Sequence, residues 1–192
     1  MADTGNRLNH LAGKLFKLKP APLNIDKLLT ERLILIPFTL QICQNLLDGD
    51  FNAVHAMGLK KGISWPDDDV MDTLPRIINN LLLVKGPTGF ESWMIVKNDT
   101  LEIIGDLGFK GIKHDDGTID IGYGIIKEER RKGYAAEAVA ALVDWAFSQT
   151  IVNQITARCA IDNSGSINLL KKLNFNETSR DSEMAYWSLT RC

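Results

Sequence analysis

Two patterns of hydrophobic residues, one typical of a strand and one typical of a helix, adjoin near the middle of the chain. Residues 119–126 form an apolar, β-prone run, which predicts a strand. After a short basic turn, apolar positions recur at offsets of 3, 4, 7, 8, 11 and 12 from Ala135. They are Ala135, Ala138, Val139, Leu142, Val143, Ala146 and Phe147. At about 3.6 residues per turn these positions share one face, so the segment predicts a strand, a tight turn and an amphipathic helix.

The same periodicities divide the rest of the chain into elements. Strands are predicted at 30–37, 92–97, 101–109, 118–126, 154–161, 175–178 and 183–189. Helices are predicted at 51–57, at 70–83, at 135–147, after Thr39, and from 162–166 through Leu173. Candidate N-caps are Thr39, Asp67 to Asp69, and Asn163 or Ser164. Because residues 1–23 lack a sustained period, we predict an N-terminal arm followed by a single domain over 24–192.

The turn before the helix 135–147 has the composition of an anion site. The first N–H groups of a helix have no intrahelical partners, and the positive end of its dipole points outward. Gly133 permits a left-handed backbone or the close approach of a ligand. Arg130, Arg131 and Lys132 add positive charge where phosphates would lie. A solvated basic turn has the same composition, so both interpretations stay open on spacing alone.

Several motifs, in the correct order, resemble one protein family. Arg130-x-x-Gly133-x-Ala135 resembles the Arg/Gln-x-x-Gly-x-Gly/Ala signature of the GNAT superfamily of N-acetyltransferases. The string Gly-Tyr-Ala-Ala-Glu-Ala at 133–138 is similar to the version in the RimJ/RimL-like branch, the ribosomal-protein N-terminal acetyltransferases and their relatives. Further similar motifs are Thr30-Glu-Arg-Leu33, Ile104-Gly-Asp106, Asn163-x-x-Ser166 and the helix ending Leu-Asn-Phe175. The resemblance covers roughly residues 29–189.

This resemblance implies both a fold and a co-substrate. The GNAT fold is α/β (α+β), with a mixed, mostly antiparallel sheet of about seven strands flanked by about four helices. Acetyl-CoA would be the co-substrate, without a metal, and its pantetheine arm would lie where the fourth and fifth strands splay apart. The residues implied in binding it are the backbone of Ile125 and Ile126, the turn residues Arg130, Arg131, Lys132, Gly133, Tyr134 and Ala135, and Asn163 on the other side.

The resemblance also implies a direct transfer through a tetrahedral intermediate, with a neutral primary amine attacking the acetyl thioester. Such an amine must first lose a proton, and a carboxylate can accept it. Asp120 is the first candidate for this base and Asp106 the second. Ser166 is the first candidate to protonate the departing thiolate, because RimJ/RimL-like relatives place a serine at this motif position. Tyr123 and Tyr134 are alternatives.

The acceptor amine is less well defined by the sequence. The loop 58–69 matches a region that helps to form the acceptor pocket in the family, so Trp65 is a candidate for substrate binding together with Tyr123. Trp65 could equally pin the loop to the core. The short connection 179–182 departs from the longer acidic connection of many RimJ/RimL-like proteins. A protein N-terminus and a small-molecule amine therefore both remain possible acceptors.

Composition and charge narrow the classes of partner. Hydrophobic residues make up 45%, charged residues 24%, and the formal net charge is −2, so nucleic-acid binding is not expected. No apolar run approaches the roughly 20 residues that span a bilayer, and the N-terminus lacks a secretory apolar core, so we expect a cytoplasmic protein without a membrane partner. The three cysteines and three histidines are scattered, which matches neither a disulfide framework nor a metal site. We expect a monomer or a homodimer.

Two other classes of function remain as alternatives. A non-catalytic acetyl-CoA-binding or regulatory module would keep the phosphate turn and tolerate the loss of Asp120 and Ser166. A nucleotide-binding domain could use the same turn for ATP, but the chain has no Gly-x-x-x-x-Gly-Lys-Ser/Thr motif.

Overall fold

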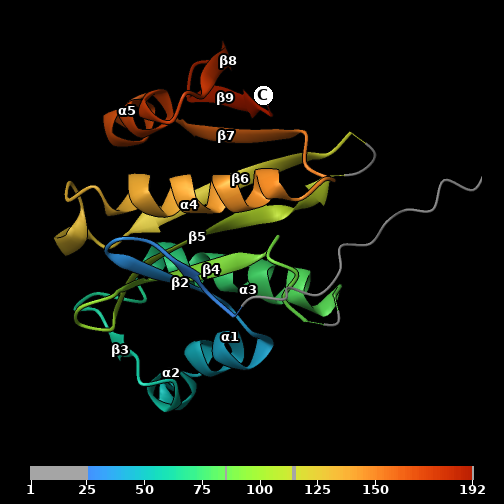
Figure 1. Cartoon of the computed structure of the whole chain (residues 1–192). Helices are drawn as coiled ribbons and strands as arrows, with labels where there is room; N and C mark the ends of the chain where they lie inside the picture. Colours follow the sequence, from blue (N-terminus) through green and yellow to red (C-terminus); the bar gives the residue numbers. More distant parts are fainter. Residues whose placement is uncertain (1–25, 85, 114–115, 192) are drawn as a thin grey trace, which may run out of the picture.

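The computed structural model describes residues 26–84, 86–113 and 116–191 as a sheet flanked by helices (Figure 1). The strands are β1 (Leu28–Leu29), β2 (Leu33–Pro37), β3 (Lys60–Lys61), β4 (Ser92–Lys97), β5 (Glu102–Lys113), β6 (Thr118–Ile125), β7 (Gln154–Ala160), β8 (Asn176–Arg180) and β9 (Met184–Thr190). The helices are α1 (Leu40–Leu47), α2 (Asn52–Ala56), α3 (Asp68–Leu82), α4 (Tyr134–Ser148) and α5 (Ser164–Lys172). A single 3₁₀ turn, Lys127–Glu129, follows β6.

The strand order in the sheet is β1-β2-β4-β5-β6-β7-β9-β8, with β3 paired to β5 outside this path. All neighbours are antiparallel except β6 with β7 and β3 with β5. The prediction of a mixed, mostly antiparallel sheet is therefore confirmed. The expected numbers of about seven strands and about four helices are exceeded, with nine strands and five helices in the described residues. The extra strands β1 and β3 have two residues each, too few to show a period.

Helices cover both faces of the sheet. In Figure 1, α4 crosses the front of β5 and β6, while α3 lies behind the sheet. Because α4 turns its predicted apolar face inward, its buried residues are Ala138, Val139, Leu142, Val143 and Ala146. The core between the layers also contains the fully buried indoles of Trp93 and Trp187. The amphipathic period of α4 therefore decides which side of this helix meets the strands.

Local capping follows the predicted chemistry at three helices. The side chains of Thr39, Asp67 and Asn163 accept hydrogen bonds from the backbone N–H three residues later, at distances of 3.2, 3.1 and 3.0 Å. Each bond satisfies one of the donors that a helix start leaves free. At the end of α5, Asn174 takes a left-handed conformation with φ of 62°. A residue of this kind ends a helix without a glycine.

The sheet opens between β6 and β7. These parallel strands pair only where residues 118–120 of β6 meet 154–156 of β7. Beyond this point β6 stays with β5 as far as Ile125, while β7 stays with β9 as far as Ala160. The edge of β6 that faces β7 therefore has no strand partner from Ile121 onward, within the part of the chain that the structure describes. The predicted splay of the fourth and fifth long strands is confirmed by this pairing.

The predicted arm at 1–23 lies outside the described residues, as do His10, His114 and Cys192. Among the residues that the structure does describe, no helix is long and apolar enough to cross a membrane. The same residues contain no cluster of three or more His, Cys, Asp or Glu side chains that could hold a metal ion.

Candidate active site

The turn between β6 and α4 is held in a left-handed conformation. Gly133 is the N-cap of α4 with φ of 86°, and Arg131 has φ of 63°. No side chain caps this helix start, so the first backbone N–H groups of α4 remain available in the turn. An N-terminus of this kind can bind an anion through its N–H groups and its dipole.

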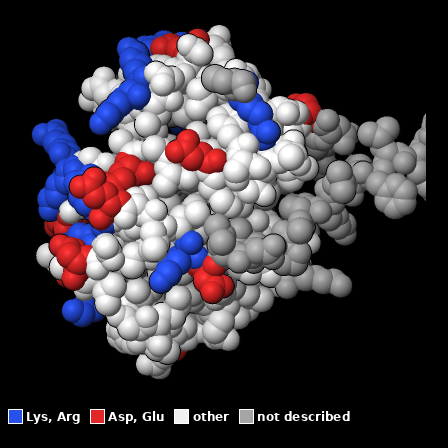
Figure 2. All heavy atoms as spheres, in the orientation of Figure 1, with Lys and Arg blue, Asp and Glu red and all other residues white. Residues whose placement is uncertain are grey.

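The three predicted basic residues of this turn have different contacts. The Nε atom of Arg130 donates to the carbonyl oxygen of Ile125 at 2.7 Å, which closes the turn onto the end of β6. Lys132 pairs with Glu129 at 2.8 Å. Arg131 is exposed and forms no ion pair with another described residue. Figure 2 shows acidic and basic side chains side by side on the edge of the molecule where this turn lies in Figure 1. The turn is thus less uniformly basic than its sequence indicates.

A fourth basic residue, just before β2, supports this turn and is not among the predicted site residues. Arg32, just before β2, donates from Nε to Glu137 of α4 at 2.7 Å and from Nη1 to the carbonyl oxygen of Lys132 at 3.0 Å. Its guanidinium lies 4.7 Å from the centre of the Tyr134 ring. Glu137 also accepts from the hydroxyl of Thr30 at 2.5 Å. The sequence contained a signal for this cluster, because Thr30 and Arg32 belong to the motif at 30–33 and Glu137 to the motif at 133–138, both of which carry the family resemblance.

The open edge of β6 brings two predicted proton donors together. Burial raises the pKa of Tyr123 to about 12, and the neighbouring Ser166 hydroxyl only partly offsets this effect. The Tyr123 hydroxyl is buried and has no well-formed hydrogen bond within the described residues.

Asn163 uses its side chain to cap α5 at the backbone of Ser166. Cys159 is a buried thiol whose pKa is raised by burial, as for a small core residue.

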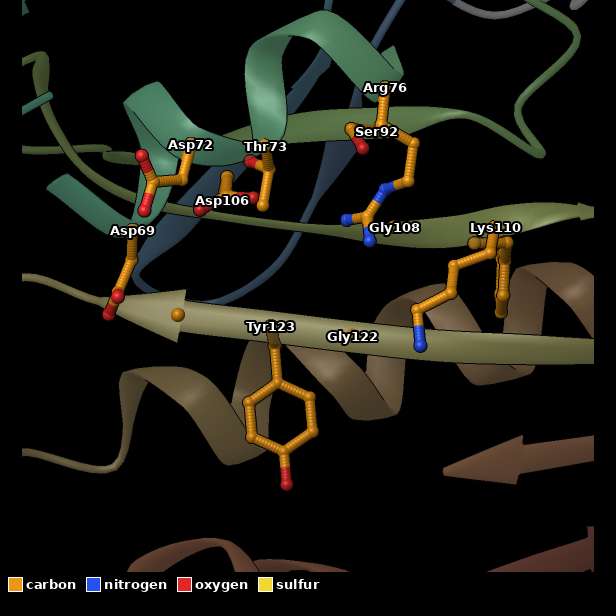
Figure 3. Close-up of a pocket in the computed structure, with 12 residues that line it drawn as sticks. Asp69, Asp72, Thr73, Arg76, Ser92, Asp106, Gly108, Lys110, Gly122 and Tyr123 are labelled. Carbon is orange, nitrogen blue, oxygen red and sulfur yellow. The ribbon is translucent and has the colours of Figure 1, made fainter. Parts of the chain in front are cut away.

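A cavity of about 350 Å³ lies between α3 and the strands β5 and β6 (Figure 3). Its lining residues are Asp69, Asp72, Thr73 and Arg76 of α3, Ser92 of β4, Asp106, Gly108, Phe109 and Lys110 of β5, and Gly122, Tyr123 and Gly124 of β6. A side chain at Gly122 would meet no atom within 4 Å. The glycines of β6 therefore leave the sheet backbone open to a small ligand on this side, while the ring of Tyr123 points away from α3.

Asp106 is a cavity residue with an unusual acidity. It pairs in register with Gly124 of β6, and its Oδ1 atom is 3.6 Å from the position that a Gly124 Cβ would take. Burial, followed by the charge of Asp67, raises the pKa of Asp106 to about 7, and Arg76 acts in the opposite direction. The carboxylate forms no hydrogen bond with another described side chain or backbone group. A carboxylate that titrates near neutral pH is well matched to accept a proton from an amine.

Asp120 has a different environment, although it lies on the same face of the sheet. It pairs with Lys110 at 2.5 Å and accepts from the hydroxyl of Thr156 at 3.3 Å. Lys110 lines the cavity, whereas Asp120 does not. The carboxylate of Asp120 is therefore already engaged by a cation, while that of Asp106 is free to meet a ligand.

Trp65 lies in the core and away from the cavity. Its side chain is 1% exposed, and it is absent from the cavity lining. The loop that carries it contacts the turn after β6, where Ser64 donates to Glu128 at 2.6 Å. This position matches the pinning role that the sequence left open, and it gives Trp65 no direct surface for a substrate.

Comparisons with known proteins place this arrangement of parted strands and an uncapped helix start in a family. A family model described as an acetyltransferase (GNAT) domain matches residues 32–176. Uncharacterized N-acetyltransferase YjdG from Bacillus subtilis strain 168 is 38% identical over 158 residues, which cover 82% of this chain and 94% of the relative. Uncharacterized N-acetyltransferase p20 from Bacillus licheniformis is 31% identical over 167 residues, which cover 84% of this chain and 89% of the relative.

Solved structures share the fold at low sequence identity. RimL, a ribosomal L7/L12 α-N-protein acetyltransferase, has a TM-score of 0.62 and 16% identity over 84% of this chain and 92% of its own. The microcin C7 self-immunity acetyltransferase MccE, in complex with acetyl-CoA and AMP, has a TM-score of 0.60 and 14% identity over 84% of this chain and 94% of its own. The chain belongs to the GNAT family and is an N-acetyltransferase.

Proposed function

We propose that this protein transfers the acetyl group of acetyl-CoA to a primary amine that enters the cavity beside α3. The observation that carries the proposal is the coincidence of two features on one strand. β6 loses its partner β7 at Ile121, and the same strand ends in the left-handed turn before α4. The unpaired edge can pair with an extended ligand arm, as a sheet edge does with an added strand, and the turn can bind the phosphates at its end.

The residues on the cavity side would prepare the amine. Asp106 is a better candidate for the base than Asp120, because its carboxylate has no cationic partner at hydrogen-bond distance and its pKa is about 7. At neutral pH about half of such groups are ionised and able to accept the amine proton. The neutral nitrogen then forms a bond to the acetyl carbon, and the carbonyl π electrons move to oxygen to give a tetrahedral intermediate. Collapse of this intermediate restores the carbonyl and breaks the carbon–sulfur bond. The backbone N–H groups along β6 would stabilise the oxygen charge that develops between these events.

The departing thiolate would meet Tyr123 and Ser166 on the other side of β6. Tyr123 stays protonated at neutral pH because its pKa is raised to about 12, so its hydroxyl can donate a hydrogen bond or a proton. Ser166 lies beside it at the start of α5. Acetyl-CoA would supply the activated acyl group, and the bond changes need no metal. Of the predicted cofactor residues, Arg131, Gly133, Tyr134 and Ala135 would bind its phosphates.

The test is isothermal titration with acetyl-CoA on the native chain and on the double variant Arg131→Glu, Gly133→Glu. A matched control is Lys27→Glu, Gly49→Glu, which changes one exposed lysine and one left-handed glycine with open surroundings, both outside the turn before α4. We expect the turn variant to lose at least tenfold in affinity, about 1.4 kcal/mol, and the control to bind like the native chain.

Two results would overturn the proposal. One is a native chain that does not bind acetyl-CoA, and the other is an equal loss in the control. If binding holds, release of free CoA in the presence of primary amines distinguishes an enzyme from a non-catalytic acetyl-CoA-binding module. Competition between ATP and acetyl-CoA in the same titration tests the nucleotide alternative.

A further inference from the structure

The cavity beside α3 has two electrically different ends. Figure 3 shows the carboxylates of Asp69, Asp72 and Asp106 toward one end and the side chains of Arg76 and Lys110 toward the other. The acidic end lies against Gly124, where β6 approaches the phosphate turn. An amine that is to be acetylated would therefore enter at the acidic end of the cavity.

The basic end contains one uncompensated cation. Lys110 is neutralised by Asp120 at 2.5 Å. Arg76 projects from α3 toward Gly108, and it forms no hydrogen bond or ion pair with any other described residue. A guanidinium that faces a cavity with its donors free is suited to a planar anion such as a carboxylate, which it can hold through two parallel hydrogen bonds.

From this polarity we propose that the acceptor is a small zwitterionic amine whose anionic group lies several bonds away from the nitrogen. The inference rests on the proposed function, because it assigns the reacting amine to the Asp106 end. A diamine would place its second cation against Arg76, and an amine without an anion would leave Arg76 without a partner. The cavity volume of about 350 Å³ is near the lower end of the range for small-ligand pockets, roughly 300–1,000 Å³.

The spacing of the charged residues along α3 gives the approximate scale of such a molecule. Arg76 follows Asp72 by four residues and Asp69 by seven, which corresponds to about 6 to 10 Å along the axis of α3. An α-amino acid is too short to connect the two ends, because its charged groups are separated by only two bonds. An ω-amino acid such as ε-aminocaproate spans the distance.

The experiment compares three acceptors of similar length in the acetyl-transfer assay. They are ε-aminocaproate, its neutral amide, and the diamine cadaverine. For the native chain we expect the carboxylate to have a KM at least about tenfold lower than the amide or the diamine, the usual scale for a charged hydrogen bond. Glycine and γ-aminobutyrate, which are shorter, report on the length of the site.

Variants of Arg76 test the source of this preference. We expect Arg76→Gln to raise the KM for ε-aminocaproate about tenfold more than the KM for the amide. Because Arg76 also lowers the pKa of Asp106, kcat should fall at neutral pH, and by the same factor for both acceptors. Arg76→Lys should restore part of the preference. Arg158→Gln is the matched control, because Arg158 is an exposed arginine on β7 outside the cavity. An equal effect of Arg76→Gln on the KM for the acid and on the KM for the amide would overturn the inference.

Ligand binding without acetyl-CoA separates this inference from the proposed function. The same three compounds are added to the native chain and to Arg76→Gln, and the melting temperature is measured. Selective stabilisation of the native chain by ε-aminocaproate supports the zwitterionic site even if no acetyl transfer occurs. Acetyl transfer to cadaverine or the amide with an equal or lower KM than to the carboxylate would reject the inference and leave the transferase function intact.

Discussion

Replacing Asp106 by asparagine should lower activity and raise stability in the same molecule. Asparagine keeps the size of the side chain but cannot accept the amine proton, so we expect kcat/KM to fall by roughly 100-fold to 10,000-fold. If Asp106 accepts the amine proton as proposed, its ionised carboxylate is the active form, and activity should rise with pH through about 7. This ascending limb should disappear in the variant.

The stability change follows from the pKa of Asp106. Its value in the folded chain is about 7, against 3.8 for an unperturbed aspartate, so the folded state binds the proton more tightly than the unfolded state. The sign follows from proton linkage: stability relative to a neutral residue is greatest below about pH 3.8 and falls as pH rises toward 7. The full difference corresponds to roughly 4 kcal/mol. Because the cavity admits water, we expect roughly 1–3 kcal/mol between about pH 5 and about pH 8.

Urea denaturation of both chains at these two pH values measures the effect. Asp106→Asn should gain stability relative to the native chain on going from the lower to the higher pH. Asp120→Asn is the control, since it leaves Lys110 without its partner in a partly exposed ion pair. It should lose at most about 1 kcal/mol and keep the pH limb of activity.

Either of two observations would contradict this role of Asp106. If activity still rises with pH near 7 in Asp106→Asn, and this rise is lost in Asp120→Asn, the base is Asp120. If the stability difference between Asp106→Asn and the native chain does not change with pH, the burial that raises this pKa is absent in solution.

Three further predictions test the surrounding structure. Tyr123→Phe removes a buried hydroxyl without a well-formed hydrogen bond, so the melting temperature should stay equal or rise while kcat falls; a large loss of stability would contradict this. Arg32→Gln breaks the contacts to Glu137 and to the turn, and calorimetry should show a several-fold weaker affinity for acetyl-CoA with little change in melting temperature. Leu142→Ala opens a cavity under α4 at a position with 0% exposure and should cost about 2–5 kcal/mol in urea denaturation.

The amphipathic period and the helix N-caps could be predicted from the sequence. The apolar period of residues 135–147 predicted the buried face of α4, and Thr39, Asp67 and Asn163 predicted helix starts that their hydrogen bonds confirm. These features depend on residues within a few positions of one another, so the chain order contains the necessary information. Glycine at position 133 also permits the left-handed backbone that the structure has there.

The choice between carboxylates could not be made from the sequence. Asp106 and Asp120 are both acidic residues in or beside apolar strands, and Asp120 is the first candidate from sequence because its strand leads to the expected cleft. The antiparallel register of β5 and β6 then sets Asp106 opposite Gly124 and brings Lys110 to Asp120. A shift of register would exchange these neighbours, and register is a tertiary property.

The sequence by itself therefore determined the longer helices and strands, three helix N-caps, the glycine-containing turn before α4 and, through its motifs, the family. Only the tertiary structure decided which side chains share an environment. It buried Trp65, although its segment has the pattern of an exposed loop, and it joined Arg32 to Glu137 across 105 positions of the chain. It also placed Arg76 and Asp106 around one cavity. The physical reason is that helix periods and caps are short-range effects, whereas burial, ion pairing and pKa depend on residues brought together from distant segments.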